Sequence, residues 1–498
     1  MLYELLLSLC AGVAAFALAD GALASRLLAL ALAPLAYVYS WCTVYTLGGY
    51  AAFALYTSVE RPRLYAHSRA AADELVAACP ALRRYTPTPW LTLGLPAWLA
   101  GHTVTVGFFI RASWEGRLQF ERTVVANTDS DGGVFAVDWA AQHREDRSRP
   151  VVLILHGLAG SSKSVYCQCL VHTLLARGFR CVVLNARGCG GVPLSTARGF
   201  TAAFTEDVRF AAKHVRREVG EGVPLYAVGF SLGSTILTKY LCEEGGATPL
   251  DAAIAVSPSF DMLITDATIM QPSYAVTYSK FLVSGLHKWA TDLPQSIRRQ
   301  LSSKDGVDWK VLAAQTTVRG FDEQTVCKIY GYANTFDYYR DASTRPLLMV
   351  RPASRAGTPP PQHTERLRCR QQLNAALGEL TAARAERRRG QRDGSEHIAR
   401  LDSSIAAQRA RVSAIRAALR RSTPGVSVPL LAVSCAGDPI CNSAGIPTDA
   451  PLINPNLTFV VTRHGGHTFW PSGLWPTRPT MWLEQLATEW LSSRPTHR

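Results

Sequence analysis

Residues 224–242, PLYAVGFSLGSTILTKYLC, place a G-x-S-x-G turn between an apolar strand pattern and a helix pattern. A strand-turn-helix of this kind forces its central residue into an unfavourable backbone conformation. Only small residues two positions away let the strand and the helix pack so closely. The turn therefore exposes the hydroxyl of Ser231 and predicts a nucleophile there. An ordinary Gly/Ser turn is the alternative, because so short a pattern also arises by chance.

A second apolar strand, VVLILHGLAG at 151–160, ends in His156-Gly157. Where a sheet carries such a nucleophile turn, the backbone N–H just past this strand joins the N–H after the nucleophile. We therefore predict that the Leu158 and Leu232 N–H groups form an oxyanion hole. Donors of this kind act where negative charge develops, and loss of one costs about two to three orders of magnitude in rate.

Two later segments supply an acid and then a histidine, in the chain order Ser, Asp/Glu, His. VPLLAVSCAGDP places Asp438 in the loop after an apolar run, and LTFVVTRHGGH places His467 past two glycines. In this prediction Asp438 orients His467. His467 takes the proton of Ser231 and later returns it to the leaving group.

Each of these two positions has an alternative. His464 lies only three residues from His467, but it is closer to the strand end, where a structural histidine is the more common role. Asp449 follows a second loop among prolines and is most simply a solvated turn residue. His467 and Asp438 are therefore preferred.

The chain carries a longer series of motifs around these residues. They are HGLAG at 156–160, NARGCGG at 185–191, TED at 205–207, YAVGFSLG at 226–233, AVSPSFD at 255–261, YGYANTFDYYRDAS at 330–343, GDP at 437–439 and RHGGH at 463–467. The series resembles the membrane-anchored α/β-hydrolase-domain lipid hydrolases, which include the mammalian ABHD one/three group, the YheT-like bacterial hydrolases and the yeast ethyl-ester synthases. DGGVFAVDW at 131–139 looks like the hairpin that precedes these motifs in the family.

The resemblance implies an α/β-hydrolase fold, a lipid-ester substrate and the same three residues, Ser231, Asp438 and His467. No metal or organic cofactor is implied, because a triad needs none. The chain departs from the family at two points. GDP stands where many relatives have two consecutive acids, and Ser234 stands where a second glycine is common.

At 498 residues the chain exceeds one compact core, so a hydrolase domain of about 300 residues with additions is expected. Strand and helix patterns alternate over 151–257, as a doubly wound parallel sheet requires. The predicted parts are a membrane anchor (1–59), a docking segment with the opening strands (60–150), the two halves of the hydrolase core (151–259 and 425–498), a cap (260–353) and an insertion (354–424). The many aromatic residues of the cap region are expected to form its core.

Residues 27–59 contain no charged side chain, and about 20 apolar residues suffice to cross a bilayer. This predicts one membrane-spanning anchor within 27–57. The shorter uncharged run at 5–19 leaves open a signal-like segment, a second hairpin helix or an interfacial helix. Arg61, Arg63 and Arg69 follow the anchor and only Arg26 precedes it, which favours a cytosolic catalytic body on a single-pass membrane protein. The endoplasmic reticulum is one candidate for this membrane.

The insertion has apolar residues at heptad spacing, which predicts a helical hairpin broken near 390–394. Between 362 and 421 it holds fourteen arginines against six acids, a net charge of +8 within a chain total of +14. Such a face could contact anionic lipid or a protein partner; the alternative is a solvated hairpin whose arginines keep it soluble. Nucleic-acid binding is not expected, because the excess charge is local and no recognition motif accompanies it.

The twelve cysteines show no paired spacing typical of a disulfide framework or a zinc site. The sequence therefore predicts a membrane-anchored serine hydrolase that cleaves phospholipid or acylglycerol esters through an acyl-Ser231 intermediate. Transfer of the acyl group to an alcohol is the near alternative. A catalytically silent scaffold that binds through its basic hairpin is the alternative from another class.

Overall fold

The computed structural model describes residues 60–88, 92, 97–111, 118–352, 361–389, 395–473 and 480–494, with helical positions at 42, 44–46 and 48–49. The chain divides into two compact units, Met1–Ser58 and Val59–Arg498. The anchor predicted within 27–57 lies almost wholly outside the described residues, and the run at 5–19 lies entirely outside them. Within the described part of the chain, no helix combines the length and the apolar character needed to cross a membrane.

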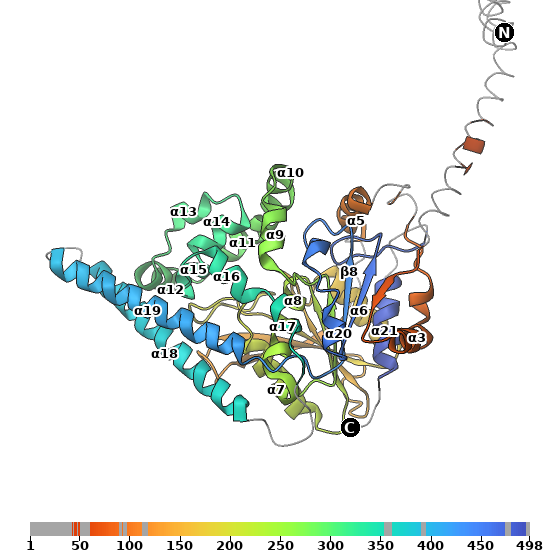
Figure 1. The fold of residues 1–498 in the computed structure, drawn as a ribbon, viewed down its shortest axis with the longest axis horizontal. Coiled ribbons are helices and arrows are strands. Elements are labelled where there is room, and N and C mark those ends of the chain that lie inside the picture. The colour runs from red at the N-terminus through yellow and green to blue at the C-terminus, as the bar shows by residue number, and fades with distance from the viewer. Residues whose placement is uncertain are drawn as a thin grey trace, which may run out of the picture. The chain divides into compact units, whose positions relative to one another are not determined.

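The described strands form one nine-stranded sheet in the order β1-β9-β8-β7-β6-β4-β5-β3-β2. Figure 1 shows this sheet with β8 labelled and helices on both of its sides. Neighbouring strands from β5 to β9 run parallel, whereas β1, β2 and β3 join antiparallel at the edges. The parallel strands are almost fully buried, as their continuous apolar runs require. The bounds are β1 Arg63–Tyr65, β2 Phe120–Ala126, β3 Val134–Ala140, β4 Val151–Leu155, β5 Arg180–Asn185, β6 Leu225–Phe230, β7 Ala252–Val256, β8 Leu430–Cys435 and β9 Leu457–Thr462.

Helices cover both faces of this sheet. Side chains alternate along β4, so Leu153 packs in a core with α7 (Glu206–Val219) and α8 (Leu232–Glu244). Its neighbour Ile154 packs in the opposite core with α3 (Arg69–Ala78), α6 (Val165–Ala176) and α21 (Trp482–Ser492). This is the doubly wound arrangement that the alternation over 151–257 predicts. Helix α5 (Ala97–Arg111) precedes β2, and the short α20 (Ala450–Ile453) precedes β9.

A helical cap lies between β7 and β8 in the chain and has a hydrophobic core of its own. Tyr330, Tyr338 and Tyr339 are buried in it, as expected, but Phe281 and Phe336 are exposed. The cap helices are α9 Met262–Ile269, α10 Pro272–Tyr274, α11 Lys280–Thr291, α12 Gln295–Gln300, α13 Trp309–Ala313, α14 Val318–Gln324, α15 Val326–Ile329 and α16 Thr335–Ala342, followed by α17 Arg345–Leu348. Two π-helical turns, Ala275–Ser279 and Leu301–Asp305, connect them.

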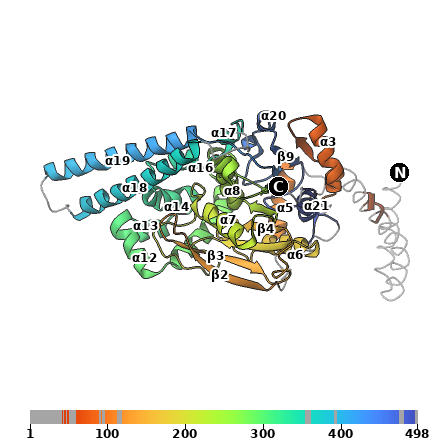
Figure 2. The ribbon, with the colours of Figure 1, turned by 90° about the horizontal axis from the view of Figure 1, so that it is seen from below.

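The insertion contains two long helices, α18 (Pro361–Arg389) and α19 (Ser395–Arg421), which lie side by side (Figure 2). Their seam is apolar, with Leu377, Leu380 and Val412 buried at the contact. The two helices are antiparallel, because Arg387 forms an ion pair with Asp402 and the earlier Glu379 forms one with the later Arg411. The seam therefore follows the heptad pattern seen in the sequence.

Several of the hairpin's arginines are buried. Four of them, Arg366, Arg370, Arg384 and Arg416, are buried. They donate to groups of the body or of the hairpin itself, such as Glu244, the Lys328 carbonyl and the Tyr330 carbonyl. Part of the local positive charge thus holds the hairpin against the body.

Candidate active site

Ser231 occupies the sharp turn between β6 and α8. Its backbone has φ 50° and ψ −120°, a conformation that L residues rarely adopt. A Cβ at Gly229 would lie 2.6 Å from the Ser234 Cα atom, and one at Gly233 would lie 2.4 Å from the His156 carbonyl oxygen. The two glycines of the motif are therefore required by close backbone packing, and the strained turn presents Ser231 to a cavity.

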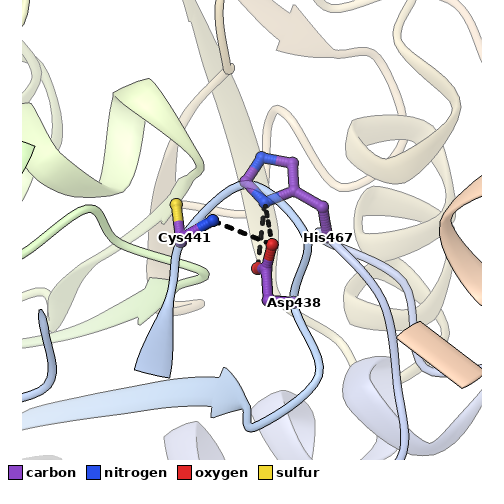
Figure 3. A group of neighbouring side chains, drawn as sticks. All are labelled: Asp438, Cys441 and His467. Carbon is purple, nitrogen blue, oxygen red and sulfur yellow. Dashed lines mark hydrogen bonds and ion pairs between the residues drawn. The ribbon is translucent and has the colours of Figure 1, made fainter. Parts of the chain in front are cut away.

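The loops after β8 and β9 bring Asp438 and His467 to this serine. His467 Nε2 lies 2.7 Å from Ser231 Oγ. On the other side of the ring, Nδ1 lies 3.0 Å from Asp438 Oδ2, and Figure 3 shows this pair. A neutral imidazole with Nδ1–H donated to the carboxylate leaves Nε2 as the acceptor for the serine hydroxyl. The backbone N–H groups of Ile440 and Cys441 donate to Asp438 Oδ1, which fixes the carboxylate.

The Cys441 thiol lies close to the same pair of residues. One ligand atom from each of Asp438, Cys441 and His467 falls within 4.8 Å of the others, a spacing that a metal ion could bridge. The thiol, however, donates to the Ser257 carbonyl at 3.3 Å, and burial raises the pKa of Cys441 well above its usual range. A metal ligand would be the thiolate, so this donor set fits a hydrogen-bonded triad better than a metal centre.

The two predicted oxyanion donors lie beside the serine. Leu158 and Leu232 line the same cavity as Ser231. Leu232 begins α8, so its N–H is one of the helix's first amides, which have no partner inside the helix. Neither amide makes a hydrogen bond with any described residue. Both are therefore available to a developing oxyanion.

His156 holds the loop that carries Leu158. Its Nε2 accepts from the Ala186 N–H at 3.1 Å, so Nδ1 carries the proton and donates to the Gly157 carbonyl at 2.7 Å. Burial lowers the pKa of His156 to about 4, which keeps the ring neutral. The Tyr166 hydroxyl accepts from the Gly157 N–H at 2.9 Å. The sequence gives this histidine a place in the HGLAG motif but no role.

Helix α5 supports the acid loop and the histidine loop together. Thr105 Oγ1 accepts from the His467 backbone N–H at 3.0 Å. A Cβ at Gly101 would lie 1.7 Å from the Gly437 carbonyl oxygen, and one at Gly466 would lie 2.7 Å from Thr105 Oγ1. This support was not predicted from the sequence. The only signal for it is a glycine four residues before a threonine in an apolar helix pattern.

A buried ion-pair network explains three of the other motifs. Arg187 of NARGCGG is fully buried and makes a bidentate pair with Asp207 of TED, with both bonds at 2.6 Å. Its Nη1 reaches Asp131, in the turn before β3, at 2.9 Å. A Cβ at Gly133 would lie 2.2 Å from the same guanidinium. These residues tie the β2-β3 hairpin to the core and do not touch the serine.

The rejected alternatives lie elsewhere. His464 is buried, and its Nδ1 lies 3.1 Å from Glu60 Oε2 beside β1. Asp449 is exposed at the start of α20. Neither residue has a hydrogen bond to Ser231 in the described structure, whereas His467 has one.

The cavity above Ser231 is lined mainly by apolar side chains from the cap. Leu282, Leu286 and Trp289 come from α11, and Phe321 and Asp322 come from α14. The sequence analysis assigned no cap residue to a pocket, because aromatic residues at helical spacing are more often core than lining. Several aromatic residues of the cap belong to its core and also line the cavity, because the cap core and the cavity share a wall.

The family model for the alpha/beta hydrolase fold matches residues 150–470. The chain belongs to the α/β-hydrolase fold family. Within it, the chain is 23% identical to mouse "Phospholipase ABHD3" over 455 residues, which cover 90% of this chain and 88% of the relative. It is 33% identical to Escherichia coli "Putative esterase YheT" over 221 residues (44% and 62%), and 32% identical to the Saccharomyces cerevisiae "Monoacylglycerol lipase" over 201 residues (40% and 44%). The resemblance predicted from the motifs is confirmed.

Proposed function

We propose that this α/β-hydrolase cleaves carboxylic esters of lipids through a covalent acyl-Ser231 intermediate. The observation that carries the proposal is the hydrogen-bonded series Ser231, His467, Asp438 at one wall of an apolar cavity beneath the cap. The names of the relatives, a phospholipase, an esterase and a monoacylglycerol lipase, support a lipid-ester substrate.

The first half of the reaction forms the acyl-enzyme. His467 Nε2 takes the proton of Ser231 as Oγ attacks the ester carbonyl carbon. The carbonyl oxygen becomes an oxyanion, which accepts hydrogen bonds from the Leu158 and Leu232 amides. As the intermediate collapses, the bond to the alcohol oxygen breaks, and His467 returns the proton to that leaving group.

In the second half, water takes the place of the alcohol. His467 removes a proton from the water, the new oxyanion uses the same two amides, and collapse releases the fatty acid and restores the Ser231 hydroxyl. Asp438 keeps the imidazole in the orientation and tautomer that both halves need. An alcohol in place of water would yield a new ester, so the ratio of alcoholysis to hydrolysis with mixed acceptors separates the two activities.

Membrane attachment through the uncharged segment within 27–57 remains part of the proposal, with the catalytic body on the cytosolic side. An apolar edge on the described unit supports contact with lipid. Trp98 and Val106 are exposed on one face of α5, and His102 between them bonds to Tyr274 and Tyr278. Val276 and Phe281, from the same part of the cap, are also exposed. Leu282, next to Phe281 in α11, lines the cavity, so we propose that an acyl chain enters on this side.

The experiment is hydrolysis of phospholipid and monoacylglycerol substrates by the detergent-solubilised chain. Asp438→Asn should lower kcat by about four orders of magnitude, because the imidazole loses its orienting carboxylate and takes the wrong tautomer. Asp449→Asn is the matched control and should leave kcat unchanged. Equal rates for the two variants, or no ester hydrolysis by the wild type, would refute the proposal. An inactive wild type would also favour the catalytically silent scaffold.

A further inference from the structure

A second cavity lies between the helical hairpin and the body. Its walls come from α18, α19, α8, α16 and the segment 198–206. Six cationic side chains line it, against three carboxylates: Glu206, Glu243 and Asp341. The cations are Arg198, Lys239, Arg366, Arg370, Arg416 and Arg420.

Three of these six cations form ion pairs with carboxylates at the cavity. Arg370 pairs with Glu243 and also with the deeper Glu244, at 3.3 and 3.0 Å. Lys239 Nζ lies 3.3 Å from Glu243 and 3.7 Å from Asp341. Arg416 Nε lies 3.8 Å from Asp341. The carboxylates around the cavity are therefore already shared among these three cations.

The other three arginines bond only to neutral oxygens of described residues. Arg198 donates to the Asn374 side-chain oxygen at 2.9 Å, and Arg420 donates to the Arg340 carbonyl at 2.9 Å. Arg366 donates through Nη1 to the Leu419 carbonyl and to Ser422 Oγ. These three arginines thus form no ion pair with a carboxylate of the described residues, although the charge of Asp131 acts on Arg198 and those of Glu243 and Glu244 act on Arg366.

Arg366 is the member of this set for which the lack of a partner is most costly. Its residue is only 3% exposed, and its Nε is buried without any acceptor in the described structure. Burial lowers the pKa of its guanidinium. The charges of Glu243 and Glu244 act in the opposite direction, but neither carboxylate forms an ion pair with Arg366 among the described residues. A buried charge without a direct counter-charge is destabilising, and arginine offers the donor pair that a phosphate oxygen pair accepts.

We propose that this cavity is a binding site for a phosphate-type oxyanion, with Arg366, Arg420 and Arg198 as its ligands. An oxyanion here would give these arginines a direct counter-charge and would join both hairpin helices to the body. The same chemistry could come from free phosphate, including a phosphorylated small molecule, or from a phospholipid head group.

The site would also act on the acyl cavity, and this part rests on the proposed function. Tyr330 and Thr201 line both cavities. The Tyr330 carbonyl accepts from Arg416, and its hydroxyl donates to the Gly199 carbonyl at 2.7 Å. An oxyanion that fixes the hairpin would therefore fix a wall that the two cavities share. We expect phosphate to change kcat or KM for ester hydrolysis by a few-fold.

The test is a titration of the detergent-solubilised full chain with inorganic phosphate, read by calorimetry and by thermal unfolding, against sodium chloride at matched ionic strength. Saturable binding and a raised Tm are expected for the wild type. Arg366→Met should weaken binding at least about tenfold, the loss that about 1.4 kcal/mol produces. Arg368→Met is the matched control, because Arg368 is exposed on the same helix.

If Arg366→Met fails to fold, Arg420→Met and Arg198→Met replace it, and each should weaken phosphate binding several-fold. A second arm uses vesicles of phosphatidate in phosphatidylcholine against phosphatidylcholine alone. Arg366-dependent binding to phosphatidate without a phosphate response would assign the head group as the source. No saturable response in either arm, or equal responses in Arg366→Met and Arg368→Met, would overturn the proposal. The binding readout needs no hydrolysis, so it stands apart from a failure of the proposed function.

Discussion

At the scale of single residues, the arrangement around His467 depends on atoms that the triad itself does not contain. Asp438 fixes one ring nitrogen, while Thr105 Oγ1 accepts from the backbone N–H of His467. That N–H would otherwise face α5 without a partner, and an unsatisfied buried donor costs about 1–3 kcal/mol. Thr105 is thus a positioning residue for the base.

Replacement of Thr105 by Val keeps the shape of the side chain and removes the acceptor. We expect kcat for ester hydrolysis to fall by about 10- to 100-fold with KM little changed, because a small displacement of a base has an effect of that size. Thr105→Ser should restore the rate. Thr277→Val, which removes an exposed hydroxyl of the cap, is the control. A wild-type kcat in Thr105→Val would show that α5 does not position His467.

Asp322 gives the cavity a titrating group. Burial raises the pKa of its carboxyl to about 7, although the Tyr339 hydroxyl donates to it at 2.9 Å. Between about pH 4 and pH 7 the folded chain therefore holds a proton that the unfolded chain has released. Folding stability carried by this group is greatest at the acid end of that window and is lost as pH rises through it.

The prediction compares the wild type with Asp322→Asn, which keeps the bond to Tyr339. The free energy of unfolding of the wild type, relative to that of the variant, should fall between about pH 5 and about pH 7.5 by at most about 1.4 kcal/mol per pH unit. The Tm of the wild type should fall relative to that of the variant over the same range. Thermal unfolding across this range measures it. A difference in Tm that stays constant with pH, or that changes in the opposite direction, would contradict a raised pKa at Asp322.

At the scale of elements, the turn from β6 into α8 requires that Gly233 has no side chain. Gly233 lies against the carbonyls of β4 and of the loop that follows it, where a Cβ would come within 2.4 Å of backbone. Backbone atoms cannot rotate away as a side chain can. The strand, the helix and the oxyanion loop can therefore meet only if this position has no side chain.

Gly233→Ala should destabilise the fold by about 1–3 kcal/mol or more and abolish ester hydrolysis, because the oxyanion loop has to move. Gly222→Ala is the matched control. Gly222 is exposed, its φ is not positive, and nothing lies within 4 Å of an added Cβ. In this control, the free energy of unfolding measured by chemical denaturation and the rate of ester hydrolysis should both be close to those of the wild type. A stable, active Gly233→Ala protein would refute the close-packing argument.

The sequence predicts these elements because the features involved are local or repeat along the chain. Ser231, Asp438 and His467 each follow an apolar strand, and the ends of parallel strands meet at one edge of a sheet. The role of Thr105 depends on a contact between residues 362 positions apart, which no local pattern reports. The burial of four hairpin arginines could not be predicted for the same reason, since composition counts charges but cannot tell which of them the body buries.

At the scale of the whole molecule, the chain combines two units with different requirements. Val59–Arg498 contains the sheet, the cap, the hairpin and every residue of the proposed site. Met1–Ser58 contains most of the uncharged run on which the proposed membrane anchor depends. The account therefore separates catalysis from permanent attachment.

Removal of residues 1–58 tests this separation. The truncated chain should hydrolyse a soluble short-chain ester with a kcat near that of the full chain, because the site lies wholly in the second unit. The full chain should stay with membranes through an alkaline carbonate wash, and the truncated chain should be released by it. A truncated chain that resists the wash would place the anchor within residues 59–498.

The central claim is that Ser231 is a nucleophile activated by His467. A fluorophosphonate probe tests it most directly, because the probe reacts with an activated serine and leaves an adduct that peptide mass spectrometry can locate. We predict one adduct at Ser231 in the wild type, no labelling of Ser231→Ala and nearly none of His467→Ala, since the members of a triad act as a unit. An unlabelled wild type, or a labelled Ser231→Ala protein, would contradict the account.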